Sequence, residues 1–156
     1  MDAIGRDHPA PGSGAAAAVA LALAAACAAK AAAISLKHQP ADVTLQSAVE
    51  SFAELARCAL AGADADAQAF EAFLRARNPD LAVRLIRTDA ELASLTDLLC
   101  ALIGEVESRV DAKVRADLAA ARQLAQAARR IHERNIAETE SVVPAATASE
   151  QRPPKS

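Results

Sequence analysis

Carboxylates on otherwise apolar helix faces are the side chains in this sequence that are best suited to take part in a reaction. Asp66 precedes Phe70 by four residues and Phe73 by seven, and Asp111 precedes Val114 by three, so helical spacing points each carboxylate with its apolar neighbours. Two inward carboxylates predict a proton-transfer site, because burial raises a carboxyl pKa toward neutrality. The same spacing also fits partly solvated carboxylates at helix starts. Spacing alone leaves both interpretations open.

Other polar groups give weaker signals. Asn135 extends an apolar stripe late in the chain, and a short loop opens the first helix with free backbone N–H groups that can hold an anion. The arginines at 129, 130 and 134 indicate either a solvated face or a contact for an anionic ligand. The histidines have no metal-ligand spacing, and we expect the cysteines to be reduced, buried and structural. The anion-binding loop consists of Gly12, Ser13 and Gly14.

The composition favours helices to position these groups. Alanine dominates the 53% of residues that are hydrophobic, Trp and Tyr are absent, and only three Phe are present. Alanine is the best helix former, and its small side chain lets helices approach closely. The net charge of −3 comes from interspersed acidic and basic residues, which disfavours nucleic acid and anionic membranes as partners. We therefore expect one all-α domain.

Helical periodicity and breaking residues divide the chain into four or five helices that form an up-and-down antiparallel bundle. Gly62 indicates a kink, the segment 88–90 a possible break, and Val106 the start of a last helix of about eight turns. Polar composition predicts disorder after the last helix. The predicted order is a loop at 1–14, a helical domain at 15–138 containing helices from 15, 43, 79 and 106, and a disordered tail at 139–156.

The first helix is apolar nearly all round, which is typical of a central helix or of one that a second subunit covers. A homodimer is therefore expected. Its apolar run at 15–36 is interrupted by Lys30 and consists mostly of alanine, and the residues before it include Asp2 and Asp7. These features oppose a signal peptide or a membrane anchor, and predict a cytoplasmic protein.

Four segments, in order, resemble the cyclodeaminase/cyclohydrolase family, which includes formiminotransferase-cyclodeaminase and bacterial methenyltetrahydrofolate cyclohydrolases. The loop at 9–15, Pro-Ala-Pro-Gly-Ser-Gly-Ala, is similar to the family's Pro-x-Pro-Gly-Gly-Gly opening, with Ser13 at its middle glycine. The segment at 34–37, Ile-Ser-Leu-Lys, resembles the end of the family's alanine-rich helix, and 66–70 its Asp-x-x-Ala-Phe segment. The Val-Asp pair at 110–111 is similar to its Ser-Asp pair, and the region 75–110 is shorter than in the family.

The resemblance implies chemistry at the carbon that bridges N5 and N10 of tetrahydrofolate, with no metal or redox cofactor. It implies proton transfer or substrate orientation by Asp66 and Asp111, and a contact from Lys37 to an anionic or carbonyl group. The 12–14 loop and Asn135 are expected to bind substrate. The alternative is a relative without catalysis, which binds folate or serves as a structural partner of another protein.

Overall fold

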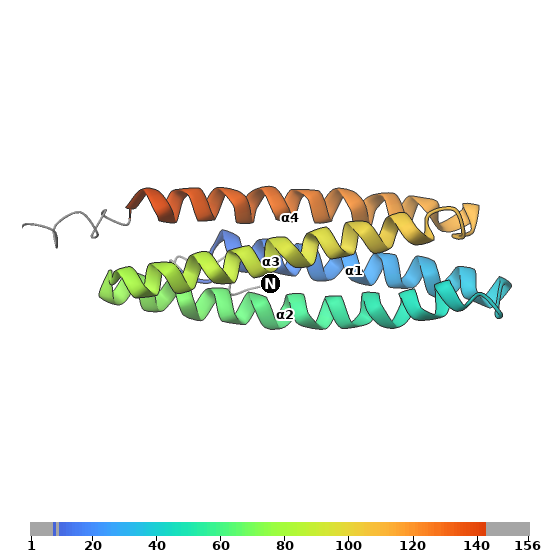
Figure 1. Cartoon of the computed structure of the whole chain (residues 1–156), viewed down its shortest axis with the longest axis horizontal. Coiled ribbons are helices and arrows are strands. Elements are labelled where there is room, and N and C mark those ends of the chain that lie inside the picture. The colour runs from blue at the N-terminus through green and yellow to red at the C-terminus, as the bar shows by residue number, and fades with distance from the viewer. Residues whose placement is uncertain (1–7, 9, 143–156) are drawn as a thin grey trace, which may run out of the picture.

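The computed structural model describes residue 8 and residues 10–142, which form four long α-helices and one short 3₁₀ helix (Figure 1). The all-α up-and-down bundle predicted from the sequence is confirmed. Residues 1–7, 9 and 143–156, with most of the predicted tail, lie outside the described residues. The elements are α1 (Ser13–His38), α2 (Val43–Ala76), α3 (Pro79–Val106), η1 (Ala112–Val114) and α4 (Arg115–Val142).

Each helix packs against the next in the chain, and α4 returns to pack against α1. The α1 and α3 helices touch little, so they occupy one diagonal of the bundle. This order brings the start of α1, the end of α2, the start of α3 and the end of α4 to one end of the bundle, which we call the α2–α3 end (Figure 1). The other end carries the α1–α2 connection, η1 and the start of α4.

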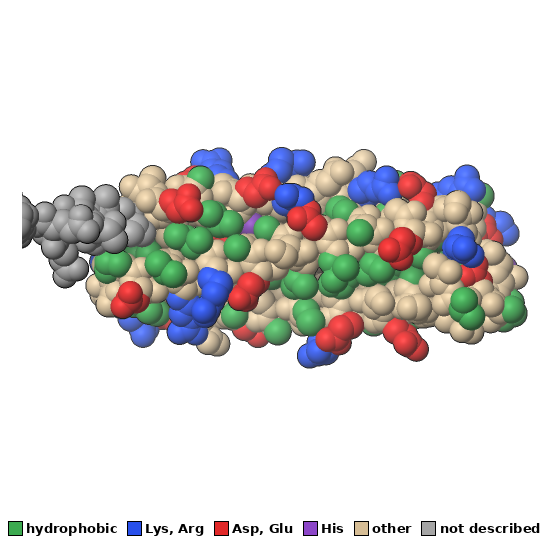
Figure 2. Space-filling model, viewed as in Figure 1, with side chains coloured by type: hydrophobic (Ala, Val, Ile, Leu, Met, Phe, Trp, Pro, Cys, Tyr) green, Lys and Arg blue, Asp and Glu red, His purple; other side chains and the backbone are tan. Residues whose placement is uncertain are grey.

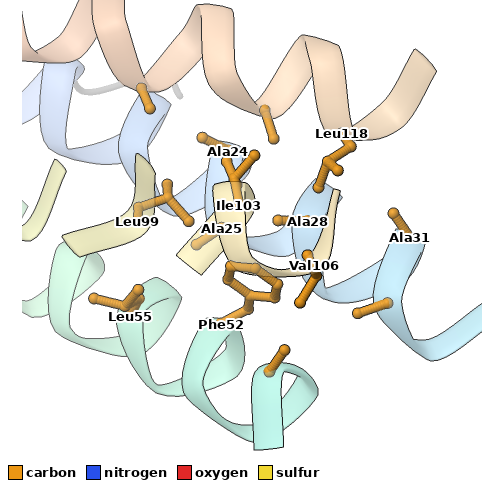
Figure 3. Close-up of a cluster of buried hydrophobic side chains, with 14 of the residues drawn as sticks. Ala24, Ala25, Ala28, Ala31, Phe52, Leu55, Leu99, Ile103, Val106 and Leu118 are labelled. Atoms are coloured by element: carbon orange, nitrogen blue, oxygen red, sulfur yellow. The ribbon is translucent and has the colours of Figure 1, made fainter. Parts of the chain in front are cut away.

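The core depends on the small side chains of α1. Ala24, Ala25 and Ala28 are fully buried and lie beside larger side chains of the other helices, such as Phe52 of α2 and Ile103 of α3 (Figure 3). Side chains of this size allow the backbones to approach, so the bulk of the core comes from α2, α3 and α4. By length and composition alone α1 would also span a membrane, but half of its most apolar window is buried inside the bundle, as in a core helix.

Helix starts follow local capping chemistry. The Asp42 side chain accepts hydrogen bonds from the backbone N–H groups of Thr44 and Leu45, and Asn78 caps α3 immediately before Pro79. Both starts agree with the sequence prediction. The α1 helix begins at Ser13, two residues earlier than predicted, and its cap, Gly12, makes no side-chain hydrogen bond.

Two predicted interruptions and one predicted helix start are wrong. The α2 helix runs unbroken through Gly62, where an added Cβ would lie 2.5 Å from Leu92 Cδ2, so this glycine serves a close helix contact instead of a kink. The α3 helix is continuous through 88–90. The last helix begins at Arg115, because α3 continues to Val106 and a connection then reverses the chain.

Two smaller expectations also change. The α4 helix extends to Val142, so the first four residues of the predicted tail are helical, and Thr139 is buried against the bundle. The three cysteines are free thiols, as expected, but each is only half-buried. They lie beside the fully buried stripes of their helices rather than within them, and Cys27 and Cys100 pack against the core from its edge.

Candidate functional site

A cavity of about 250 Å³ opens at the α2–α3 end of the bundle. All four helices contribute to its wall, because their ends converge there. The wall combines carboxylates with aromatic and aliphatic side chains, and includes the Gly-Ser-Gly loop predicted to bind substrate. Its polar and ionisable lining residues are Ser13, Asp66, Arg77, Asp89, Asn135, Glu138 and Thr139.

Asp66 is the buried carboxylate that the sequence predicted. It lies on α2 with only 3% of its surface exposed, and it faces the first turn of α1. A Cβ added to Gly14 would lie 2.4 Å from Asp66 Oδ1 and 2.6 Å from Oδ2. The carboxylate therefore occupies the space that any other residue at position 14 would fill.

The pKa of Asp66 is raised from 3.8 to about 6. Burial is the largest cause, and the negative charge of Asp89 adds to it. The charge of His132 and a backbone hydrogen bond from Ala15 act in the opposite direction. Asp66 consequently exchanges its proton much closer to neutral pH than an exposed aspartate does.

A buried aspartate–histidine pair lies next to Asp66. Asp89 Oδ1 of α3 is 2.6 Å from His132 Nδ1 of α4, and the two side chains are 1% and 0% exposed. His132 Nε2 is also buried and has no hydrogen-bond partner within the described part of the chain. The sequence pattern did not indicate this pair. Asp89 was assigned to a break, although it lies four residues after Leu85 on the buried stripe of α3.

A polar chain connects the pair to the start of α1. Asn135 Nδ2 lies 3.5 Å from Asp89 Oδ1, at the limit of a hydrogen bond, and Asn135 Oδ1 accepts a hydrogen bond of 3.0 Å from Ser13 Oγ. The structure thus brings the predicted residues Asn135 and Ser13 together with Asp66 around one cavity. Ser13 does not cap its helix, since its hydroxyl is directed to Asn135.

Aromatic rings and one arginine form another part of the wall. Phe70 and Phe73 both line the cavity, so two of the three phenylalanines of the chain are placed there. Arg77 follows α2 in a left-handed conformation, with its guanidinium 5.6 Å from the centre of the Phe73 ring. It forms no ion pair with any described residue, and Figure 2 shows basic side chains gathered near this end of the molecule.

Comparison with known proteins now identifies the family. The family described as formiminotransferase-cyclodeaminase matches residues 1–82, which is more than half of the chain. The chain belongs to this family. No match was found among curated proteins.

The fold agrees with this cyclodeaminase assignment. The crystal structure of formiminotetrahydrofolate cyclodeaminase from Thermotoga maritima is similar over 92% of this chain and 77% of that chain, with a TM-score of 0.86 and 18% identity. Asp66 and the 12–14 loop lie within the residues that match the cyclodeaminase family, whereas Asp89, His132 and Asn135 lie beyond them.

Two residues of this cyclodeaminase family member that were predicted to belong to the site lie far from the cavity. Lys37 is exposed on the last turn of α1, about 35 Å along the helix from Gly14. Asp111 is at the same distant end, where it caps η1 and pairs with His38 at 3.0 Å. Hydrogen bonding to the Lys113 N–H and to His38 lowers the pKa of Asp111. The spacing left two interpretations open for these carboxylates. Asp111 is the partly solvated carboxylate at a helix start, and Asp66 is the inward carboxylate.

The basic cluster on α4 is a solvated face. Arg129 pairs with Asp97 and Glu133, and Arg134 pairs with Glu138, all at exposed positions.

Among the described residues, no group of three or more His, Cys, Asp or Glu side chains is arranged to hold a metal ion. The cavity offers a ligand the Asp66 carboxyl group, with a pKa of about 6, the guanidinium of Arg77 and the rings of Phe70 and Phe73.

Proposed function

We propose that this chain is a one-carbon folate enzyme that acts on 5,10-methenyl- or 5-formimino-tetrahydrofolate. The observation that carries the proposal is Asp66, a carboxyl group with a pKa of about 6 in the wall of a cavity. A general acid–base group works best when its pKa lies near the working pH. Membership of the formiminotransferase-cyclodeaminase family supports the choice of substrate.

Both candidate reactions need a proton removed at one atom and returned at another. In cyclohydrolysis, water attacks the methenyl carbon, loses a proton, and the C–N5 bond breaks to leave the 10-formyl group. In cyclodeamination, N10 attacks the formimino carbon, and the amino group leaves as ammonia after protonation. The carbon keeps its oxidation level in both, so neither reaction needs a redox cofactor, and we propose no metal ion. Asp66 takes the proton from the attacking atom and returns one to the departing nitrogen.

The size of the cavity limits which part of the folate enters it. Pockets for drug-sized ligands are about 300–1,000 Å³, whereas this cavity is about 250 Å³. It therefore takes the one-carbon end of tetrahydrofolate, with Phe70 and Phe73 as apolar wall, and the benzoylglutamate tail extends outside. The homodimer expected from the sequence is part of the same proposal.

Purified protein tests the proposal directly. With methenyltetrahydrofolate, absorbance should fall faster than in the protein-free blank, and with formiminotetrahydrofolate the methenyl absorbance should appear. Size exclusion in the same buffer counts the subunits. A flat trace for both substrates on folded protein would refute catalysis. Tetrahydrofolate binding without turnover would then favour the non-catalytic folate-binding alternative.

Arg77 is expected to contact the carboxylates of the folate tail outside the cavity, because it borders the cavity, is exposed to solvent and forms no ion pair with a described residue. We predict that Arg77→Gln raises KM about tenfold and leaves kcat nearly unchanged, since the tail takes no part in bond making. Initial rates at low ionic strength measure this, where screening is weakest.

The matched control for this substitution is Arg75→Gln. Arg75 lies two residues earlier, is paired with Glu71 and does not line the cavity, so its loss should leave KM unchanged. An analogue that lacks the glutamate should give the same KM with the Arg77→Gln variant as with the unaltered protein. Equal KM values for the full substrate would remove Arg77 from the binding site.

A further inference from the structure

The buried Asp89–His132 pair has no evident role in stabilising the fold. Both side chains are almost wholly buried, with a hydrogen bond of 2.6 Å between them. Taking two ionisable groups out of water is unfavourable, and apolar residues of similar size often replace such pairs without loss of stability. The neighbouring positions of α4 on the same stripe, Ala125 and Ala128, show that this helix face accepts apolar side chains.

The pair is also incomplete as a hydrogen-bonded unit. His132 Nδ1 faces Asp89, but His132 Nε2 is buried without a partner among the described residues. An unsatisfied buried nitrogen is unfavourable in either protonation state. Asp89 lines the cavity, so the imidazole lies behind the cavity wall and reaches a ligand only through its neighbours.

The charged groups around the pair come from several helices. From α2, Asp66 lies close enough that the charges of both Asp89 and His132 affect its pKa. From α4, Glu138 lines the cavity and is paired with Arg134, and Arg77 at the end of α2 also lines it. The described part of α1 that borders the cavity contributes backbone and Ser13, with no ionisable side chain.

We propose that Asp89 and His132 act as one positioning pair, which keeps a buried proton beside Asp66 and so adjusts that carboxyl group for acid–base work in the cavity. This inference rests on the proposed function for the identity of the reaction. It extends the site from one carboxyl group to three ionisable groups. Asn135 contacts the same Asp89 oxygen that faces His132, and Ser13 in turn donates a hydrogen bond to Asn135.

The two members of the pair act on Asp66 in opposite directions. The charge of Asp89 disfavours an ionised Asp66, whereas protonated His132 favours it. Without Asp89, no neighbouring carboxylate opposes the ionisation of Asp66. Without a protonatable imidazole, the negative charges of Asp66 and Asp89 are not offset, so the two carboxyl groups share one proton and release it only at higher pH. A purely structural pair would not produce effects of opposite sign.

The test compares Asp89→Asn with His132→Asn by carboxyl ¹³C NMR titration of the full chain. Asparagine at 132 places its amide nitrogen near the position of Nδ1, so the hydrogen bond to Asp89 is retained without a titrating ring. We expect the Asp66 midpoint to fall below about 6 in Asp89→Asn and to rise above it in His132→Asn. The acid limb of the kcat/KM profile should move with it in each variant.

Asp97→Asn is the control, because it removes an exposed pair between the same two helices, Asp97 with Arg129. It should leave the Asp66 midpoint in place. Shifts in the same direction for the two test variants, or no shift beyond this control, would overturn the proposal. If His132→Asn does not fold, imidazole ¹⁵N shifts of His132 in the unaltered protein must show an inflection at the Asp66 midpoint, and their absence counts against the pair.

The NMR titration needs no turnover, so the two proposals fail separately. Opposite shifts in a protein that does not act on either folate would support the pair and refute the proposed reaction. Turnover together with an Asp66 titration midpoint that neither substitution changes would support the reaction and refute the proposed role of the pair.

Discussion

Replacing Asp66 by Asn is expected to lower turnover of the one-carbon folate by about 10²–10⁴-fold, the usual contribution of a general acid–base group. Asparagine matches the size of aspartate but neither accepts nor returns a proton at neutral pH. Because the amide still fits the space beside Gly14, substrate binding should survive and KM should change little. Initial rates with both folates measure the loss.

The same substitution should stabilise the protein in neutral and basic solution. The folded-state pKa of Asp66, about 6, lies above its ordinary value of 3.8, so the native state binds the proton more tightly than the unfolded chain does. The ionised carboxylate therefore costs the native protein stability, which falls as pH rises from about 4 through about 6. At pH 8 the Asn variant should be more stable by on the order of 2 kcal/mol, and at pH 4 the two should be nearly equal. Urea unfolding across this range measures the difference.

Asp64→Asn separates these effects from a general loss of charge on α2. Asp64 is exposed and points away from the cavity, two residues before Asp66. Its substitution should change neither turnover nor the pH dependence of stability. An Asp66→Asn protein that keeps more than about a tenth of its activity would remove Asp66 from proton transfer, because even the weakest general acid–base contribution exceeds that.

Much of the fold was predictable because its signals are local. Alanine content and helical spacing predict the four helices, and the predicted starts of the second and third helices at 43 and 79 are correct. The kink predicted at Gly62 is wrong because, from the sequence alone, a glycine in a helical pattern indicates a break. Its reason is the approach of Leu92 from another helix, which no local pattern contains.

The same limit applies to the candidate site. The spacing of Asp66 from Phe70 and Phe73 predicted its burial, which is confirmed. Asp89 and His132 are 43 residues apart, and only the packing of α3 against α4 brings them together. Asp111 was placed with Asp66 because the spacing from Val106 through Val110 to Val114 continues across the reversal between α3 and α4. Buried residues on both sides of a turn imitate one helix.

Replacing Gly14 by Ala should disable the site from the opposite side. The new Cβ would lie 2.4 and 2.6 Å from the two carboxylate oxygens of Asp66, far inside van der Waals contact. Alanine would gain up to about 1 kcal/mol in helix propensity, but overpacking of this kind costs about 1–3 kcal/mol, so net destabilisation is expected. Displacement of the carboxylate should also lower turnover at least about 100-fold, because acid–base catalysis depends on the position of the group. Urea unfolding and initial rates measure both effects.

Gly104→Ala is the matched control for this clash. Nothing lies within 4 Å of a Cβ at position 104, so alanine there should stabilise α3 by about 0.5 kcal/mol and leave turnover unchanged. The clash itself is isolated by making Gly14→Ala in an Asp66→Ala background, where the opposing carboxylate is gone. The destabilisation by Gly14→Ala should then disappear, giving a coupling energy above about 1 kcal/mol between two residues in contact. An equal cost in both backgrounds would mean that the helix start, and not Asp66, requires glycine.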